Sequence, residues 1–432
     1  MRWKMRVVLV GVAMAVCVGA VSSTTRRGVT ADRSPSDRVG KGGRDALPDQ
    51  SRPCRWRVVR TPNPGPGEHR LVAVSARSNQ DLWALGDYFS GREGGPAGSF
   101  ILHWNGVAWR VVPNPELPSY AELQGVAAVA ADDAWSVGSG NRRPVIEHWD
   151  GRRWRRMPSP ATGGRYSNLF AVTALSPRDV WAVGGRVVGR AGKALIEHWD
   201  GTRWRIVPSP SPPPRPLTGR AHDSLDAVAA RSRSDVWAVG EATNVAPAGT
   251  SNTLVEHWDG KRWAVVPSPD VRAASGRPYN HLFSVAVTAP HDAWAVGAWD
   301  AGIGVGGGGD HVLIEHWNGH RWANVSPSFG GRARSYLLAV TSRSANDLWA
   351  MGDRRLQPRS VLMAHWDGSR WNTGPSLNGS LAAATTLRSG DVWAVGSTGS
   401  HPRTLAMHCR LVPAHGSGGA PLVRLASRVL LR

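Results

Sequence analysis

The feature that most constrains this chain is a six-residue segment, Asp-x-Trp-[Ala/Ser]-x-Gly, that is written seven times. Its tryptophans recur at intervals of 44 to 57 residues. They are Trp83, Trp135, Trp181, Trp237, Trp294, Trp349 and Trp393. A repeat of this length cannot bury an apolar face alone, so neighbouring units must stack against each other.

A second element, His-Trp-[Asp/Asn]-Gly-x-x-Trp, follows six of the seven segments. It begins at His103, His148, His198, His257, His316 and His365. Together the two elements hold most of the 22 tryptophans, in a chain with only 5 Phe and 5 Tyr. So many ordered aromatic positions exclude a disordered chain. Only one apolar run exceeds a dozen residues, which excludes a membrane protein with several spans.

Each unit predicts four short strands. In the third unit they are an apolar stretch (169–174), the Asp-x-Trp segment, and two strands at 195–199 and 203–207. The Asp-Gly or Asn-Gly dipeptide between the last two predicts a two-residue type I′ hairpin. Proline-rich segments end the fourth strand, because proline cannot donate to the ladder. No helical pattern is present. The sequence predicts an all-β fold: a seven-bladed β-propeller of four-stranded antiparallel blades over residues 53–410.

The seventh unit lacks the second element, and its missing strand lies at the start of the chain. Residues 54–59 supply that strand, so we expect the N-terminal strand to close the last blade. In this alignment Cys54 corresponds to Val107 and Cys409 to Trp104, two positions that we expect to face each other across the hairpin. Facing positions suit a disulfide in an oxidising compartment. We therefore predict a Cys54–Cys409 disulfide in place of the turn; the alternative is a reactive or metal-binding pair.

The N-terminus indicates export. Three basic residues precede an uncharged run at 7–21, which predicts a signal peptide over residues 1–21. The alternative is an uncleaved anchor. Residues 22–52 are polar and predict a flexible linker, and residues 411–432 predict a flexible basic tail. Both basic segments are candidates for weak contact with an anionic envelope. We expect the protein to be secreted, or associated with the cell surface.

The paired motifs, such as DVWAVG followed by LIEHWDGTRW, resemble the Trp-Asp-Gly repeats of exported bacterial β-propellers. A more distant resemblance is to tectonin and kelch propellers. The resemblance to the Trp-Asp-Gly repeats covers residues 54–410 in all seven units. It implies a binding or scaffold module and does not identify the ligand. WD40 blades place Trp-Asp at the end of the blade, whereas here it lies at a hairpin tip. Sialidase Asp-boxes separate Asp from Gly, but Asp150 and Gly151 are adjacent. No catalytic residue is carried over from either family.

Residues that recur in every unit are expected to be scaffold. The repeated aspartates should accept backbone N–H groups, and the repeated tryptophans should fill the space between blades. The repeated histidines lie near hairpin tips around the rim, so we interpret them as structural rather than as a metal ring. No metal, nucleotide or hydrolase motif is present, and we expect no cofactor.

Candidate ligand-binding residues are those that depart from the repeat in two sets of loops on one face. They are Tyr120, Tyr166, His222, Tyr279, His281, Trp299 and Asp300. Trp299 is the one propeller tryptophan that the repeat does not require, and Glu241 belongs to the same loops. Aromatic rings beside polar groups suit sugar rings or peptide segments. The alternative is that the tyrosines cap strand entries.

Three functions follow from these observations. The first is a binding or scaffold module that recognises a glycan, a cell-wall polymer or a protein through its loops. The second is a glycan hydrolase or lyase, although Asp226 is the only acid in the first strands that should line the channel. The third is a structural or assembly protein of the envelope. The net charge of +20 raises nucleic acid as a partner, but export and the scattered basic residues argue against it. We expect a monomer.

Overall fold

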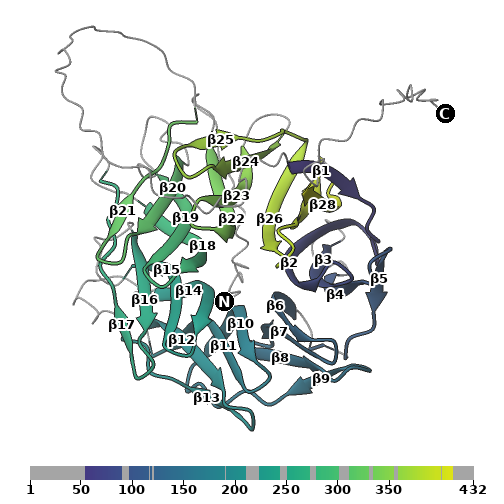
Figure 1. Cartoon of the computed structure of the whole chain (residues 1–432). Helices are drawn as coiled ribbons and strands as arrows, with labels where there is room; N and C mark the ends of the chain where they lie inside the picture. The colour runs from purple at the N-terminus through teal and green to yellow at the C-terminus, as the bar shows by residue number, and fades with distance from the viewer. Residues whose placement is uncertain are drawn as a thin grey trace, which may run out of the picture.

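The computed structural model describes most of the chain between residues 54 and 411. The described ranges are 54–89, 97–115, 117–118, 121–189, 191–210, 223–243, 251–272, 279–300, 311–329, 334–354, 359–399 and 401–411. They form seven four-stranded antiparallel sheets arranged in a ring, which confirms the predicted β-propeller (Figure 1). These ranges contain no helix, and hence none long and apolar enough to span a membrane. The predicted signal peptide, linker and tail lie outside the described residues, except that Leu411 still belongs to the last strand.

The strand bounds follow the repeat. Blade 1 consists of β2 (Glu68–Ser78), β3 (Asp81–Phe89), β4 (Ala97–Trp104) and β5 (Trp109–Val112). Blade 2 consists of β6 (Glu122–Ala130), β7 (Asp133–Gly140), β8 (Arg143–Trp149) and β9 (Trp154–Met157). Blade 3 consists of β10 (Tyr166–Ser176), β11 (Asp179–Val188), β12 (Ala191–Trp199) and β13 (Trp204–Ile206). Blade 4 consists of β14 (Asp223–Ser232), β15 (Asp235–Ala242), β16 (Asn252–Trp258) and β17 (Trp263–Val265). Blade 5 consists of β18 (Tyr279–Ala289), β19 (Asp292–Asp300), β20 (His311–Trp317) and β21 (Trp322–Asn324). Blade 6 consists of β22 (Ser335–Ser344), β23 (Asp347–Arg354), β24 (Ser360–Trp366) and β25 (Trp371–Thr373).

Blade 7 joins the two ends of the chain. It consists of β26 (Gly379–Thr386), β27 (Val392–Thr398), β28 (Arg403–Leu411) and β1 (Cys54–Val59). In Figure 1 the purple β1 lies beside the yellow β28. The prediction that the N-terminal strand closes the last blade is confirmed.

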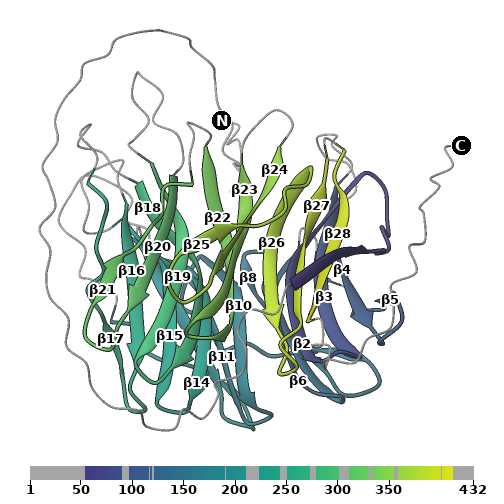
Figure 2. The same cartoon turned by 45° about the horizontal axis from the view of Figure 1, so that its top comes forward.

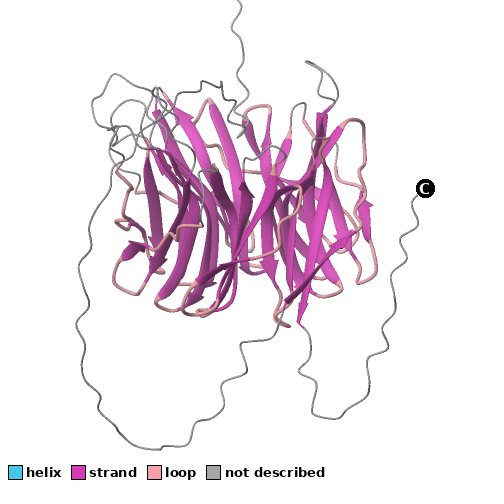
Figure 3. Ribbon diagram, turned by 90° about the horizontal axis from the view of Figure 1, so that it is seen from above, coloured by secondary structure: helices cyan, strands magenta, loops and turns pink. Residues whose placement is uncertain are grey.

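The first strand of each blade lies nearest the centre of the ring, and the fourth lies at its outer edge (Figure 1). Because the strands are antiparallel, they run between two faces of the ring (Figures 2 and 3). The first strand begins and the second strand ends on the same face, which we call the loop face. The opposite face carries the turns between strands one and two and the hairpins between strands three and four. We call it the turn face.

The register of the closing strands differs from the prediction. Trp56 pairs with Cys409, and Cys54 pairs with Leu411. In blade 1, likewise, Trp104 pairs with Trp109 and not with Val107. The two cysteines therefore lie on neighbouring strands but two positions out of register.

The reason is that the hairpins hold four residues and not two. Oδ1 of Asp150 accepts the backbone N–H groups of Arg152 and Arg153, at 3.0 Å and 2.9 Å. Gly151 has a φ of 86°, whereas Asp150 is not among the residues with positive φ. The predicted type I′ turn is wrong, because the Asp or Asn side chain closes the loop and only glycine needs the left-handed conformation.

The repeated tryptophans lie between blades, as the sequence predicts. Trp83 of blade 1 packs against Trp149 and Trp154 of blade 2, with ring centroids 5.0 Å and 5.1 Å apart. The ring of His103 lies 4.4 Å from that of Trp83, and its Nε2 lies 2.8 Å from Oδ1 of Asp81. An Asp–His pair of this kind occurs in every blade. The other six are Asp133–His148, Asp179–His198, Asp235–His257, Asp292–His316, Asp347–His365 and Asp391–His408.

The partner of the repeated aspartate is thus a histidine side chain instead of the expected backbone N–H. Asp391 accepts a backbone N–H as well, from Leu411. This arrangement gives the repeated histidine a structural role in each blade.

Candidate functional site

The first strand of every blade carries a one-residue bulge in its loop-face half. In blade 4 the register between β14 and β15 shifts between Leu225 and Ala227. The glycine of the Asp-x-Trp segment lies opposite this leucine, and a Cβ on Gly240 would lie 2.1 Å from the carbonyl oxygen of Ser224. A bulge turns its extra residue away from the regular alternation of the strand. The seven bulge residues are Val72, Gln124, Phe170, Asp226, Phe283, Leu338 and Ala382.

Asp226 is the only ionisable residue at these seven positions, and it contacts the next blade. Its Oδ2 lies 2.5 Å from Nε2 of His281 in β18. Ser224 donates a hydrogen bond to its Oδ1 at 3.0 Å. The side chain of Asp226 is 22% exposed, while that of His281 is 9% exposed. The bulge therefore directs a partly accessible carboxylate onto a buried imidazole across the boundary between blades 4 and 5.

Two further residues complete this group. Oε2 of Glu241 lies 3.7 Å from Nδ1 of His281, and the hydroxyl of Tyr279 lies 3.3 Å from the same nitrogen. Tyr279 is 41% exposed. We call Asp226, Glu241, Tyr279 and His281 the blade 4–5 cluster.

Electrostatics favour a charged imidazole in this cluster. Burial alone lowers the pKa of His281, but the negative charges of Asp226 and Glu241 outweigh it and hold that pKa above the ordinary value. Burial and the charge of Glu241 raise the pKa of Tyr279, so its hydroxyl keeps its proton. The cluster thus presents two carboxylates, an imidazole that favours its protonated form and a phenol within a few ångströms of one another. Such a group can accept hydrogen bonds from hydroxyl groups.

The structure brings together four of the predicted site residues. Tyr279 and His281 belong to the cluster, and Asp300 pairs with Tyr279 across the strands. Trp299 directly precedes Asp300 in β19, but its ring stacks on that of His311, with ring centroids 4.5 Å apart. The same ring packs against the apolar core between blades 4 and 5. Trp299 therefore has packing partners of its own, and its contact with a ligand stays a prediction.

The remaining candidates lie elsewhere. Tyr166 begins β10 in blade 3, is 40% exposed and lies beneath the guanidinium of Arg142. Tyr120 and His222 lie outside the described residues.

Asp226 and Glu241 depart visibly from the repeat in the sequence, but their position beside His281 cannot be read from it. Only the ring arrangement makes a bulge residue of one blade adjacent to the first strand of the next. One signal was present in the sequence: the residue after the repeated leucine is uncharged in six units and is Asp226 in the fourth.

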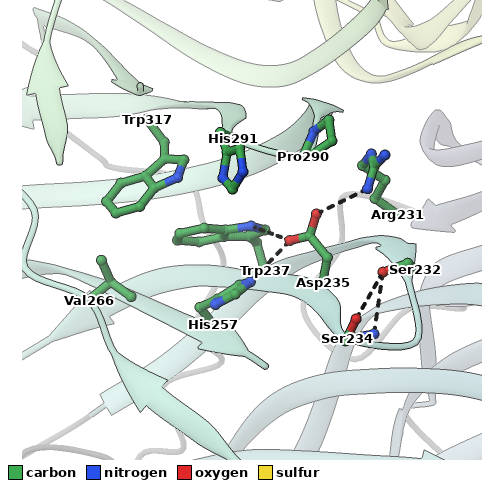
Figure 4. Close-up of a pocket in the computed structure, with 10 residues that line it drawn as sticks. All are labelled: Arg231, Ser232, Ser234, Asp235, Trp237, His257, Val266, Pro290, His291 and Trp317. Atoms are coloured by element: carbon green, nitrogen blue, oxygen red, sulfur yellow. Dashed lines mark hydrogen bonds and ion pairs between the residues drawn. The ribbon is translucent and has the colours of Figure 1, made fainter. Parts of the chain in front are cut away.

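A depression lies on the turn face between blades 4 and 5 (Figure 4). Its volume is about 410 Å³. Asp235 in its wall accepts hydrogen bonds from Nε1 of Trp237 at 2.9 Å and pairs with Nε2 of His257 at 3.0 Å. Asp, Trp and His recur at the positions of Asp235, Trp237 and His257 in every blade, so these three lining residues belong to the scaffold. The loop face carries the residues that break the repeat.

Within the described ranges, no three His, Cys, Asp or Glu side chains are arranged to hold a metal ion.

No protein-family model and no curated protein matches the chain. Solved structures resemble it in fold. YCF48 from Cyanidioschyzon merolae is 15% identical, with a TM-score of 0.50, over 82% of this chain and 98% of that one. A polysaccharide lyase, the PL25 ulvan lyase bound to -[GlcA(1-4)Rha3S]-, is 11% identical, with a TM-score of 0.52, over 79% and 93% of the two chains. YCF48 bound to a D1 peptide is 14% identical, with a TM-score of 0.49, over 82% and 96%. At these identities the similarities show the propeller fold alone.

Proposed function

We propose that this protein is a binding module whose loop face recognises a carbohydrate through the blade 4–5 cluster. The observation that carries the proposal is the Asp226–His281 pair at a position where the repeat is otherwise uncharged. Asp226 and Glu241 offer acceptors to sugar hydroxyls, and the exposed ring of Tyr279 offers apolar area beside them. A few placed polar groups beside an aromatic surface are typical of carbohydrate and peptide sites.

The proposed setting is outside the cytoplasm. The pattern of residues 1–21 supports secretion or attachment at the cell surface, and the DVWAVG and HWDGTRW motifs support kinship with exported Trp-Asp-Gly propellers. A glycan or cell-wall polymer is the ligand that such a location offers. A protein segment is the alternative ligand and is one outcome of the test.

The test is binding of the purified protein to an array of glycans and cell-wall fractions. We expect at least one glycan to bind, and Asp226→Asn and Tyr279→Ala to weaken that binding by roughly tenfold. The matched control is Asp132→Asn, which makes the same chemical change at an exposed turn-face position. No binding to any glycan, or equal binding by wild type and both cluster variants, overturns the proposal. Binding only to a protein or peptide fraction favours the alternative ligand.

A second candidate is a glycan hydrolase or lyase, because Asp226 and His281 form a pair of titratable groups beside the hydroxyl of Tyr279. Such a group has the composition needed for acid and base roles. Here we expect turnover of a polysaccharide that Asp226→Asn abolishes and Asp132→Asn leaves unchanged. Binding without turnover by the wild-type protein excludes this candidate for the polysaccharides tested.

A further inference from the structure

The hairpin between β7 and β8 holds an arginine in an unfavourable backbone conformation. Gly140 pairs with Arg143, so the turn consists of Asn141 and Arg142. Their φ angles are 50° and 66°, and they are the non-glycine residues with positive φ in the described part of the chain. Arginine is disfavoured in this region, whereas glycine adopts it freely. Retaining Arg142 there suggests that its side chain has a use.

The side chain of Arg142 is held against blade 3. Its guanidinium lies 4.7 Å from the ring centroid of Tyr166. The carbonyl oxygen of Arg142 accepts the backbone N–H of Ser167 at 3.0 Å. The hairpin of blade 2 thus places a cation over an exposed aromatic ring at the edge of the loop face.

Three more basic residues lie near Tyr166 in sequence or on the neighbouring strands. Arg165 directly precedes Tyr166 and is exposed. Arg186 pairs across the strands with Ser167 on one side and with Lys193 on the other. Like charges directly opposite each other on neighbouring strands destabilise a sheet. The Arg186–Lys193 pair is therefore a second unfavourable feature near Tyr166, besides the backbone conformation of Arg142.

The acidic residues that could neutralise this group are few. No carboxylate in the described ranges forms an ion pair with Arg142, Arg165 or Lys193. The Nη1 group of Arg186 donates to the carbonyl oxygen of Thr162 at 2.7 Å, and its Nε is buried without a hydrogen-bond partner there. Glu197 is fully buried, and burial raises its pKa to about 7 although the charge of Arg186 acts in the opposite direction.

We propose that Arg142 and Arg165 beside Tyr166, with Arg186 and Lys193 on the neighbouring strands, form a second site that binds the carboxylate or sulfate groups of an acidic polysaccharide. This inference rests on the proposed carbohydrate-binding function and adds the charge of the ligand. Arginine side chains match the planar oxygens of such groups through paired hydrogen bonds. The half-exposed ring of Tyr166 offers a sugar an apolar surface beside them.

The experiment measures binding of the whole protein to polygalacturonate, to dextran sulfate and to neutral dextran, at low and at high salt. The test variant carries Arg142→Gly and Arg165→Gln. Glycine relieves the positive φ at position 142, so this variant should fold at least as well as wild type. The control variant carries Arg152→Gln and Arg178→Gln, which removes the same charge from exposed positions on the turn face.

We expect wild type and control to bind at least one of the two anionic polymers, and the test variant to bind it roughly tenfold more weakly. Preference for polygalacturonate or for dextran sulfate distinguishes a carboxylate from a sulfate ligand. Failure of wild type to bind either anionic polymer overturns the inference. An equal loss in test and control variants also overturns it, because it shows an effect of net charge alone.

The two proposals fail separately. If Asp226→Asn weakens binding of a neutral glycan while neither anionic polymer binds, the blade 4–5 cluster is supported and the basic site is overturned. If an anionic polymer binds and the Arg142→Gly, Arg165→Gln variant binds it more weakly, while Asp226→Asn has no effect on any glycan, the basic site is supported and the blade 4–5 cluster is overturned.

Discussion

Trp56, near the start of the described chain, packs edge-on against Trp349 of blade 6, with ring centroids 5.2 Å apart and an interplanar angle of 84°. Trp349 belongs to the set of tryptophans that each pack on the hairpin of the next blade. In blade 7 that hairpin is absent, and β1 supplies one of its two tryptophans. Cys409 occupies the position of the other, and it is fully buried. The ring is therefore closed by contacts between residues at opposite ends of the chain.

Cys54 pairs with Leu411 and not with Cys409, but the two cysteines lie on neighbouring strands, and we predict that they form a disulfide in the exported protein. The bond would close a loop of about 355 residues, which the chain-entropy model values at about 6 kcal/mol. Mature protein lacking residues 1–21 should show no free thiol when unfolded without reductant, and reduction should lower its thermal midpoint. The Cys54→Ser, Cys409→Ser double variant should behave like the reduced protein. Two free thiols in the unfolded, unreduced sample would contradict the prediction.

Trp56→Ala should destabilise the propeller by about 3 kcal/mol, because it removes a large ring from the contact with Trp349. Val58 lies on the same strand and is 61% exposed, so Val58→Ala is the matched control. We expect the control to change the free energy of unfolding by less than about 0.5 kcal/mol. Urea denaturation of both variants measures the difference. If Trp56→Ala changed the free energy of unfolding as little as Val58→Ala, the contact between Trp56 and Trp349 would contribute little to closure of the ring.

The propeller could be predicted because the same two sequence motifs recur in nearly every blade. The period sets the number of blades, and the places where the repeat fails show how the ring closes. Two local details could not be read in the same way. The dipeptide Asn105-Gly106 fits both a two-residue turn and a four-residue loop, and only the side-chain bonds of Asn105 decide between them. The predicted register of Cys54 is wrong because it depends on that loop length.

The candidate sites could be predicted only in part, since they depend on contacts between blades. Tyr279 and His281 stood out as breaks in the repeat. Their partner Asp226 lies 55 residues from His281 in sequence, and the bulge that directs it is set by backbone packing. Arg142 carries no sequence signal at all, because its importance lies in its backbone conformation and in its position over Tyr166.

The free energy of unfolding should fall as pH rises through neutrality. Glu147, Glu197 and Glu256 are fully buried at the same position of blades 2, 3 and 4, and burial raises the pKa of each to about 7. In the unfolded chain these groups titrate near 4.5. Between these values the folded state holds protons that the unfolded state has lost, so stability is fully present below pH 4.5 and is lost as pH rises through 7. Urea denaturation at a series of pH values from 5 to 8 measures the slope.

The sequences of blades 1 and 7 suggest a variant that tests whether the buried glutamates cause this pH dependence. Leu102 and Met407 stand where blade 2 has Glu147, and Ala84 stands opposite Leu102 where Ser136 stands opposite Glu147. The Ser136→Ala, Glu147→Leu variant copies the blade 1 pair. We expect it to be more stable than wild type by about 1–2 kcal/mol at pH 8 and to have a shallower pH slope. An unchanged slope would assign the pH dependence to other groups, such as His281.

The hairpin loops offer a test in which the repeat supplies its own control. Oδ1 of Asn105 accepts the backbone N–H groups of Val107 and Ala108, both at 3.0 Å. Four other hairpins use aspartate for the same bonds: Asp150, Asp200, Asp259 and Asp367. We therefore expect Asn105→Asp to leave the free energy of unfolding almost unchanged, and Asn105→Ala to lower it by about 1 kcal/mol.

Val107 lies in the same loop and is 83% exposed, so Val107→Ala removes side-chain atoms without touching these bonds. It should be nearly neutral in the same urea denaturation experiment. If Asn105→Ala were also neutral, glycine at position 106 alone would be sufficient to form the turn. A loss with Asn105→Asp equal to that with Asn105→Ala would show that the amide has a role that the carboxylates of the other blades do not share.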